Sequence, residues 1–260
     1  MDLGIAGRTA FVAASSQGLG LACARSLVRE GVAVTLNGRD RAKLAAASDT
    51  LRSEVGGAKV TWIAADLTTA EERAAIVAAR PDVDILVTNN AGPAPGTIDD
   101  WDEAALVGAL RANMVPAVQL IRAWLPGMRA RKFGRIVNIT SAMVKSPAYE
   151  MGLSTSARAA LTAISKAIST DVARDNVTVN NLLPERIDSP RQEFMAQRMM
   201  ASEGIGHDEA FARIASTIAA GRLGRPEEFG DACAFLCSAQ AGYISGQNLQ
   251  LDGGSYSGLV

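Results

Sequence analysis

The sequence feature that most constrains the fold is a regular alternation of short apolar runs with longer alanine-rich stretches. The short runs contain many β-branched residues and are apolar throughout, which predicts strands of a sheet buried on both faces. Such strands in alternation with helices predict a parallel, doubly wound α/β sheet. The predicted strands are Thr9–Ala13, Val32–Leu36, Val60–Ala64, Ile85–Thr88, Arg135–Ile139, Val177–Leu182 and Asn248–Leu251. The predicted helices include Leu19–Glu30, Arg41–Glu54, Thr69–Ala79, Ser154–Ala173 and Pro226–Ser238.

The 260 residues are enough for one domain of this kind, and no linker, repeat or low-complexity tract divides them. We therefore predict a single domain over residues 1–260. One segment, Asp188–Gly221, interrupts the alternation because it contains no convincing strand. We expect a helical insertion there, over the carboxyl ends of the strands where ligands bind in such sheets, and interpret it as a substrate lid. An ordinary structural excursion is the alternative.

A glycine turn joins the first predicted strand to the first predicted helix. Gly18 and Gly20 allow a tight turn and a close approach of the backbone to a ligand. The amides at the start of the helix and the helix dipole favour an anion at this point. The turn therefore predicts a site for the phosphates of a dinucleotide, although an ordinary strand-to-helix turn can also contain glycines.

The end of the second predicted strand indicates which dinucleotide is bound. In dinucleotide folds an acid at this point binds the ribose hydroxyls of NAD, whereas an arginine accommodates the 2′-phosphate of NADP. Here neutral Asn37 precedes Arg39, whose guanidinium suits a phosphate. The sequence therefore favours NADP(H) over NAD(H). Asp40 weakens this prediction, because it could instead pair with Arg39.

Together with motifs farther along the chain, these residues resemble the short-chain dehydrogenase/reductase family, in particular its 3-oxoacyl-carrier-protein reductase-like members. The resemblance extends over nearly the whole chain, and its most specific motif is the intact turn Asn89–Gly92 after the fourth strand. It implies a Rossmann-type fold and a catalytic set at Asn113, Ser141, Ser154 and Arg158. The implied cofactor contacts are Ala14, Ser15, Ser16, Gln17, Gly18, Leu19, Gly20, Asn37, Arg39, Asp66, Leu67, Asn90, Ala91, Gly92, Arg158, Pro184, Ile187 and Ser189.

The chain departs from the family at the two positions closest to the chemistry. The family uses a Tyr and a Lys, four residues apart on one helix, and these positions hold Ser154 and Arg158 here. None of the three tyrosines has a lysine four residues later. An alkyl hydroxyl is a far weaker acid than a phenol, and an arginine keeps its charge but cannot give up a proton. Glu185 also replaces a glycine beside the cofactor, and Ala14 replaces another in the phosphate turn.

We therefore expect an NADP(H)-dependent oxidoreductase that interconverts a carbonyl and an alcohol by hydride transfer, with an altered proton donor. Loss of an acid–base group commonly costs about 10²–10⁴-fold in rate. Three ways to supply the missing acid or to avoid the need for it remain open. In the first, the phenol of Tyr149 reaches the site. In the second, Ser141 and Ser154 stabilise an oxyanion while water supplies the proton. The third is that the substrate is an imine or activated alkene. The alternative from another class is a catalytically impaired pseudoenzyme that binds the cofactor as a sensor or inactive partner.

Composition narrows the partners and the compartment. With 26 basic and 27 acidic residues, the net charge of −1 gives no reason to expect nucleic acid or a membrane. No apolar run approaches the length of about 20 residues that spans a bilayer, and the N-terminus lacks a signal peptide. Cys233 and Cys237 are interpreted as buried thiols, the lone His207 as a surface residue, and no metal is expected. We predict a cytoplasmic protein with a small-molecule substrate. The resemblance implies a homotetramer or homodimer built on the stretches Trp101–Arg131 and Ser154–Ala173.

Overall fold

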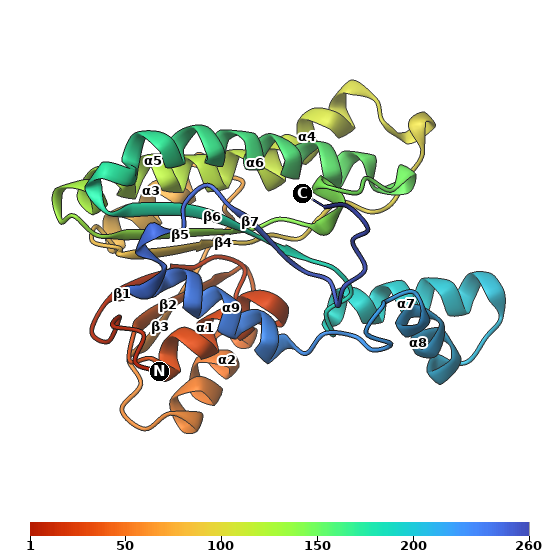
Figure 1. Cartoon of the computed structure of the whole chain (residues 1–260), viewed down its shortest axis with the longest axis horizontal. Coiled ribbons are helices and arrows are strands. Elements are labelled where there is room, and N and C mark those ends of the chain that lie inside the picture. Colours follow the sequence, from red (N-terminus) through yellow and green to blue (C-terminus); the bar gives the residue numbers. More distant parts are fainter. Residues whose placement is uncertain (260) are drawn as a thin grey trace.

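The computed structural model describes residues 1–259 and contains one seven-stranded sheet in the order β3-β2-β1-β4-β5-β6-β7 (Figure 1). All neighbouring strands are parallel, so the predicted doubly wound α/β sheet of the Rossmann type is confirmed. The strands are β1 (Thr9–Val12), β2 (Ala33–Gly38), β3 (Val60–Ala64), β4 (Ile85–Thr88), β5 (Gly134–Ile139), β6 (Val177–Pro184) and β7 (Asn248–Leu251).

Helices cover both faces of this sheet. Figure 1 shows α1, α2 and α9 on one face and α3, α4, α5 and α6 on the other. Their bounds are α1 (Gly18–Arg29), α2 (Arg41–Glu54), α3 (Ala70–Ala79), α4 (Glu103–Asn113), α5 (Val115–Ala130), α6 (Gly152–Val172) and α9 (Pro226–Cys237). Two further helices, α7 (Pro190–Glu203) and α8 (His207–Ser216), follow β6 and project beyond the sheet at the right of the view. The segment that interrupts the sequence alternation is therefore helical.

The long apolar stretch before β5 is two helices rather than one. The helix ends at Asn113 and restarts at Val115, and Pro116 lies in the first turn of α5 where its missing N–H costs no helical hydrogen bond. The 28-residue run Glu103–Ala130 contains an 18-residue window with a mean hydropathy of 1.4, so by length and composition alone it is long and apolar enough to cross a membrane. The expectation that no run has this length is therefore wrong. Core helices of soluble proteins have the same composition, and α5 buries Leu120 and Trp124 against the sheet.

Two apolar clusters, one on each side of the sheet, form the core. The first joins α1, α2 and α9 to the sheet and includes Leu27, Leu36 and Phe229. It also holds the three cysteines, which are buried and unoxidised, as predicted for Cys233 and Cys237. Contact with neighbouring thiols and burial raise the pKa of Cys233 and of Cys237 well above the ordinary value. These thiols are packing groups rather than nucleophiles.

The first cluster depends on a close approach of α1 and α9. A Cβ on Gly230 would clash with the carbonyl oxygen of Ala22 and would lie 2.7 Å from the Ser26 hydroxyl oxygen. We expect Gly230→Ala to destabilise the fold by about 1–3 kcal/mol, since overpacking of a rigid contact has this cost. Thermal unfolding followed by circular dichroism measures it. Gly56→Ala, where nothing lies within 4 Å, is the matched control and should leave Tm nearly unchanged. An equal Tm for both variants would contradict the packing argument.

Candidate cofactor and catalytic site

The turn between β1 and α1 is held in a single shape by a strained residue and a close contact. Ala14 has a φ of 45°, in the left-handed region that favours glycine, at a cost of about 1–2 kcal/mol. Its carbonyl oxygen accepts a hydrogen bond of 3.1 Å from the Asn89 side chain. A Cβ on Gly20 would clash with that same oxygen. No side chain caps α1, so the amides at its start remain for a ligand such as a phosphate.

Two residues predicted to contact the cofactor lie beneath this turn. The Ser15 hydroxyl is buried, donates to the Val12 carbonyl at 2.7 Å and accepts from the Asn37 amide at 3.0 Å. The Asn37 side-chain amide donates to the carbonyls of Ile63 and Ala65, each at 3.2 Å. These polar groups are therefore bonded within the protein, where they join the ends of β1, β2 and β3 and shape the cradle.

The tip of β2 is where the sequence predicts the adenosine end of the cofactor. The position that a Cβ on Gly38 would occupy is 3.4 Å from the Ser16 hydroxyl oxygen, so Ser16 lies beside the tip of β2. Asp40 caps α2 by accepting from two backbone amides, and it makes no ion pair with Arg39. Asp66 accepts hydrogen bonds from Thr68, and these bonds, with a smaller effect of the Arg39 charge, lower its pKa. Arg39 and Ser16 thus form a polar, positively charged end of the site.

Ser154 and Arg158 lie together one helical turn apart at the start of α6, and both are buried. Arg158 Nε donates to Ser154 Oγ at 3.2 Å. One terminal nitrogen donates to the carbonyls of Ile139 and Thr140, at 3.0 and 2.8 Å, and the other donates to Asn90 Oδ1 at 3.3 Å. No carboxylate of the described chain pairs with the Arg158 charge.

The charge of Arg158 is costly in this position. Burial, with a smaller effect of the nearby Arg191 charge, lowers the pKa of Arg158 to about 10. The guanidinium is still a cation at neutral pH. A buried cation without an acid partner is unfavourable unless hydrogen bonds and a ligand compensate for its lost hydration. The site therefore suits a group that carries or develops negative charge.

The turn after β4 closes over this pair of side chains. The Asn90 side chain donates to the Ala112 carbonyl at 2.7 Å while its oxygen receives the Arg158 hydrogen bond. A Cβ on Gly92 would lie 3.3 Å from Ser154 Oγ and 3.5 Å from Arg158. A glycine at this position keeps a side chain from crowding Ser154 and Arg158. The structure thus brings together the motif around Asn90 and the Ser154–Arg158 pair, as the sequence predicted.

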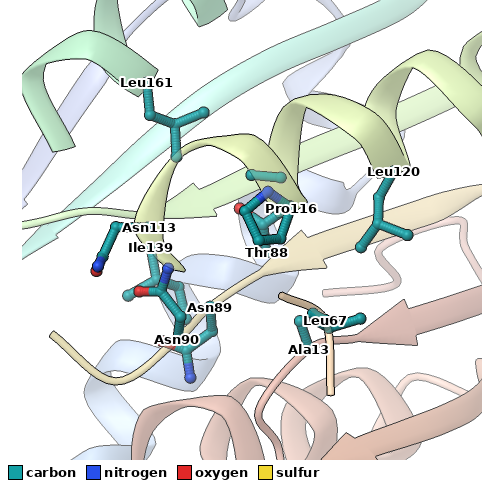
Figure 2. A pocket seen from close by; sticks show the side chains of 11 residues that line it. Ala13, Leu67, Thr88, Asn89, Asn90, Asn113, Pro116, Leu120, Ile139 and Leu161 are labelled. Atoms are coloured by element: carbon teal, nitrogen blue, oxygen red, sulfur yellow. The ribbon is translucent and has the colours of Figure 1, made fainter. Parts of the chain in front are cut away.

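The other two predicted catalytic residues flank this centre. Ser141 Oγ accepts from the Met143 amide at 3.2 Å, and the Asn113 side chain donates to the Ala109 carbonyl at 3.1 Å. The Asn113 side-chain oxygen is buried without a partner. A cavity of about 10 Å³, enough for one water, is lined by Asn113, Asn90 and Leu161 among others (Figure 2). A water here could donate to the unpartnered oxygen.

Tyr149 does not turn toward Ser154. It is 63% exposed, its ring lies 5.6 Å from Trp101, and its hydroxyl accepts from the Ile98 amide at 3.3 Å. The route in which Tyr149 donates the proton is not the arrangement seen. Sequence reasoning missed a second phenol: Tyr256, from the C-terminal tail, packs its ring 5.2 Å from the Lys145 ammonium in the loop after Ser141. No local sequence signal reveals the contact of Lys145 with the distant tail.

The segment after β6 completes the wall of the site. Glu185, where the resemblance implies a glycine, directly follows β6: burial raises its pKa, and it forms a 3.1 Å ion pair with Arg186. Ser189 precedes α7, and Pro190 Cδ lies 3.6 Å from where a Cβ on Gly18 would be. The start of α7 therefore borders the phosphate turn. His207 is on the surface beside Glu193, at 3.1 Å, as predicted.

A larger hollow of about 400 Å³ lies elsewhere, at the amino ends of β1, β2 and β3. It contains none of the predicted site residues. Ligands of open parallel sheets bind outside the carboxyl ends of the strands, where the Gly18–Gly20 turn, Asn90 and Ser154 lie. The candidate site is therefore at the carboxyl end.

Together, this fold and this site define a dinucleotide-binding oxidoreductase scaffold. Residues 13–256 match a family model described as "Enoyl-(Acyl carrier protein) reductase". NADPH-dependent reductase BacG of Bacillus subtilis is 32% identical over 97% of this chain and 99% of the relative. The 3-oxoacyl-[acyl-carrier-protein] reductase FabG of Rickettsia bellii is 31% identical over 96% and 97%. The crystal structure of L-sorbose reductase from Gluconobacter frateurii, complexed with NADPH and L-sorbose, is 30% identical with a TM-score of 0.94, and the match covers 100% of both chains. The chain belongs to the short-chain dehydrogenase/reductase family.

Proposed function

We propose that this protein is an NADP(H)-dependent oxidoreductase that interconverts a carbonyl and an alcohol, with Ser154 and Arg158 in place of a Tyr–Lys pair. The observation that carries the proposal is the buried Arg158 cation, which has no acid partner among residues 1–259 and lies beside the Gly92 turn, at the same end of the sheet as the turn between β1 and α1. The uncapped amides at the start of α1 and the guanidinium of Arg39, which has no ion pair within the described chain, are groups that bind phosphates, so the residues present fit this cofactor. When bound, the reduced nicotinamide supplies the hydride.

The hydroxyl groups of Ser154 and Ser141 each accept a hydrogen bond within the protein. Ser154 Oγ accepts from Arg158, and Ser141 Oγ accepts from the Met143 amide. Neither hydroxyl hydrogen has an acceptor among residues 1–259, so both remain to donate to a substrate oxygen. Negative charge develops on that oxygen as hydride arrives, and two hydroxyls beside a guanidinium stabilise it. Neither group is acidic enough to release a proton readily, so solvent water protonates the oxygen.

A reductase of imines or activated alkenes is the second candidate. The observation that favours it is the position of Tyr149, whose phenol is bonded to the Ile98 amide and leaves the site without that acid. Hydride addition to a conjugated alkene places charge on the distant carbonyl oxygen as an enolate. Ser154 and Arg158 stabilise this oxygen, and water then protonates the carbon. Such a substrate needs less acid help than a simple ketone.

The experiment that tests the function follows oxidation of NADPH with three classes of substrate: ketones, conjugated enones and cyclic imines. Deuterium transfer from 4-deuterated NADPH to the product, detected by mass spectrometry, proves that hydride was transferred. Turnover of a ketone supports the main proposal, and turnover of enones or imines alone supports the second candidate. Tight NADPH binding with no turnover of any class would favour the pseudoenzyme alternative.

Arg39 is expected to select the phosphorylated cofactor. Arg39→Gln removes a charge-assisted contact to the 2′-phosphate, so NADPH binding should weaken about tenfold while NADH binding changes less than about twofold. Quenching of tryptophan fluorescence measures both dissociation constants. The matched control, Arg29→Gln, lies at the far end of α1 and should change neither. Equal losses for NADPH and NADH would contradict a role at the 2′-phosphate.

We also propose that the protein assembles as a homodimer or homotetramer through α4, α5 and α6. The apolar Leu106 and Val107 on α4 are 42% and 38% exposed in the single chain, which supports a covered face there. Light scattering should give twice or four times the chain mass of 27.1 kDa, and Leu106→Arg should lower it. A monomeric parent would refute the assembly.

A cytoplasmic location is proposed from the three free cysteines, and fractionation to another compartment would refute it.

A further inference from the structure

Arg191, in the first turn of α7, carries a guanidinium that no other group of the described chain neutralises. The residue is half-buried, and its guanidinium carbon lies 5.4 Å from the centroid of the Phe194 ring. It makes no hydrogen bond or ion pair with residues 1–259. A long side chain that loses part of its hydration without a partner is unfavourable in the free protein, and this suggests that a ligand completes it.

Two of the acids near Arg191 in the sequence are already paired with other groups. Glu185 forms its ion pair with Arg186, and Glu193 binds His207 at 3.1 Å and Gln197 at 2.8 Å. The charges close enough to act on Arg191 and on Arg158 are themselves arginines: Arg198 affects Arg191, and Arg191 affects Arg158. No carboxylate of residues 1–259 forms an ion pair with Arg158 or with Arg191.

Both groups border the same site. Arg191 follows Pro190, which lies against the Gly18 turn, and Arg158 lies beneath Gly92. Four of the five N–H donors of Arg158 already have hydrogen-bond partners. All five N–H donors of Arg191 have no partner among residues 1–259 and remain to bind a ligand. Arg158 can therefore stabilise a single atom, while Arg191 can hold a two-oxygen group with its planar fork.

We propose that Arg191 binds a carboxylate of the substrate, so that the protein acts on an oxo acid or its conjugated analogue rather than on a neutral ketone. This assignment rests on the proposed function, since the carbonyl is placed at Ser154 and Arg158. The cofactor's pyrophosphate is a second source of the same chemistry. The amides at the start of α1 already provide for that anion, which leaves Arg191 for the substrate.

The test compares an acid with its neutral ester on the cofactor-loaded protein. Phenylglyoxylate and methyl phenylglyoxylate share one ketone and differ in charge, and calorimetric titration into the NADP⁺ complex measures binding without turnover. We expect the parent to bind the acid at least about tenfold more tightly than the ester. Arg191→Gln should abolish this preference, leave ester binding unchanged, and change the NADPH dissociation constant less than about twofold.

Arg198→Gln is the matched control, because it removes the same charge from an exposed side chain two turns farther along the same helix. It should retain most of the preference for the acid. Equal binding of acid and ester by the parent, or binding of neither, would overturn the assignment. If Arg191→Gln lowered the affinity for NADPH tenfold but kept the preference for the acid over the ester, Arg191 would bind the pyrophosphate of the cofactor and not the substrate. If the protein bound the acid but reduced no carbonyl, the proposed function would be contradicted while the carboxylate site would still be supported.

Discussion

Arg158→Met is expected to lower kcat/KM by about 10²–10⁴-fold while the protein stays folded. The guanidinium is the one cation that contacts both Ser154 and Asn90, at 3.2 and 3.3 Å. Methionine fills a similar volume but cannot polarise the Ser154 hydroxyl or stabilise an oxyanion. Steady-state kinetics on the substrate found by the turnover screen measures the loss.

The stability of this variant is a second, independent readout. Methionine leaves the carbonyls of Ile139 and Thr140 without their donor, at about 1–3 kcal/mol for each unsatisfied group. It also removes a buried cation that lacks an acid partner, which is favourable. These effects oppose each other, so we expect the unfolding free energy to change by no more than about 2 kcal/mol. Arg158→Lys keeps the charge with fewer donors and should retain more activity than methionine. Full activity in Arg158→Met would contradict the assigned role.

The double variant Ser154→Tyr with Arg158→Lys is expected to change the pH dependence of reduction rather than to increase its rate. In the parent, the Ser154 hydroxyl does not titrate near neutrality and the pKa of Arg158 is about 10. Reduction by the parent should therefore be independent of pH from about 6 to 9. A phenol donor must be protonated, so the rate of the double variant should fall as pH rises through the phenol pKa, which the lysine lowers from about 10.

The comparison uses kcat/KM of both proteins on the same substrate across this pH range. A parent that is active and a double variant that is no faster at neutral pH would show that Ser154 and Arg158 have their own working chemistry. The variant Lys166→Arg, on the exposed side of the same helix, is a control and should leave the flat profile unchanged. Activity confined to the double variant would contradict this account and favour the pseudoenzyme.

Local sequence patterns predicted the elements and the position of the site because these depend on neighbouring residues. Apolar runs become parallel strands wherever they can be covered on both faces, and the glycines after β1 lie where backbone clearance requires them. The Asn89–Gly92 turn and the Ser154–Arg158 pair are close because each follows or faces the end of a central strand. The resemblance placed them in one site before any contact was known.

Tertiary contacts decided the rest. Ser15 and Asn37 were expected at the cofactor, but their polar groups are hydrogen-bonded to carbonyls under the turn. Tyr149 is held by Ile98, which is distant in sequence. The unpaired charge of Arg191 becomes visible only when the partners of Glu185 and Glu193 are known. Only the burial and the hydrogen-bond partners of each residue show whether it shapes the site or remains available to bind a ligand.

We propose that the chain binds NADPH in the turn between β1 and α1, with Arg39 at the 2′-phosphate. The most direct measurement is titration of the purified protein with NADPH and, separately, with NADH, followed by quenching of tryptophan fluorescence. We expect a micromolar dissociation constant for NADPH and binding of NADH that is at least about tenfold weaker. Failure to bind either cofactor would mean that Ala14, Glu185 and Arg158 have closed the site, and it would contradict the proposed oxidoreductase.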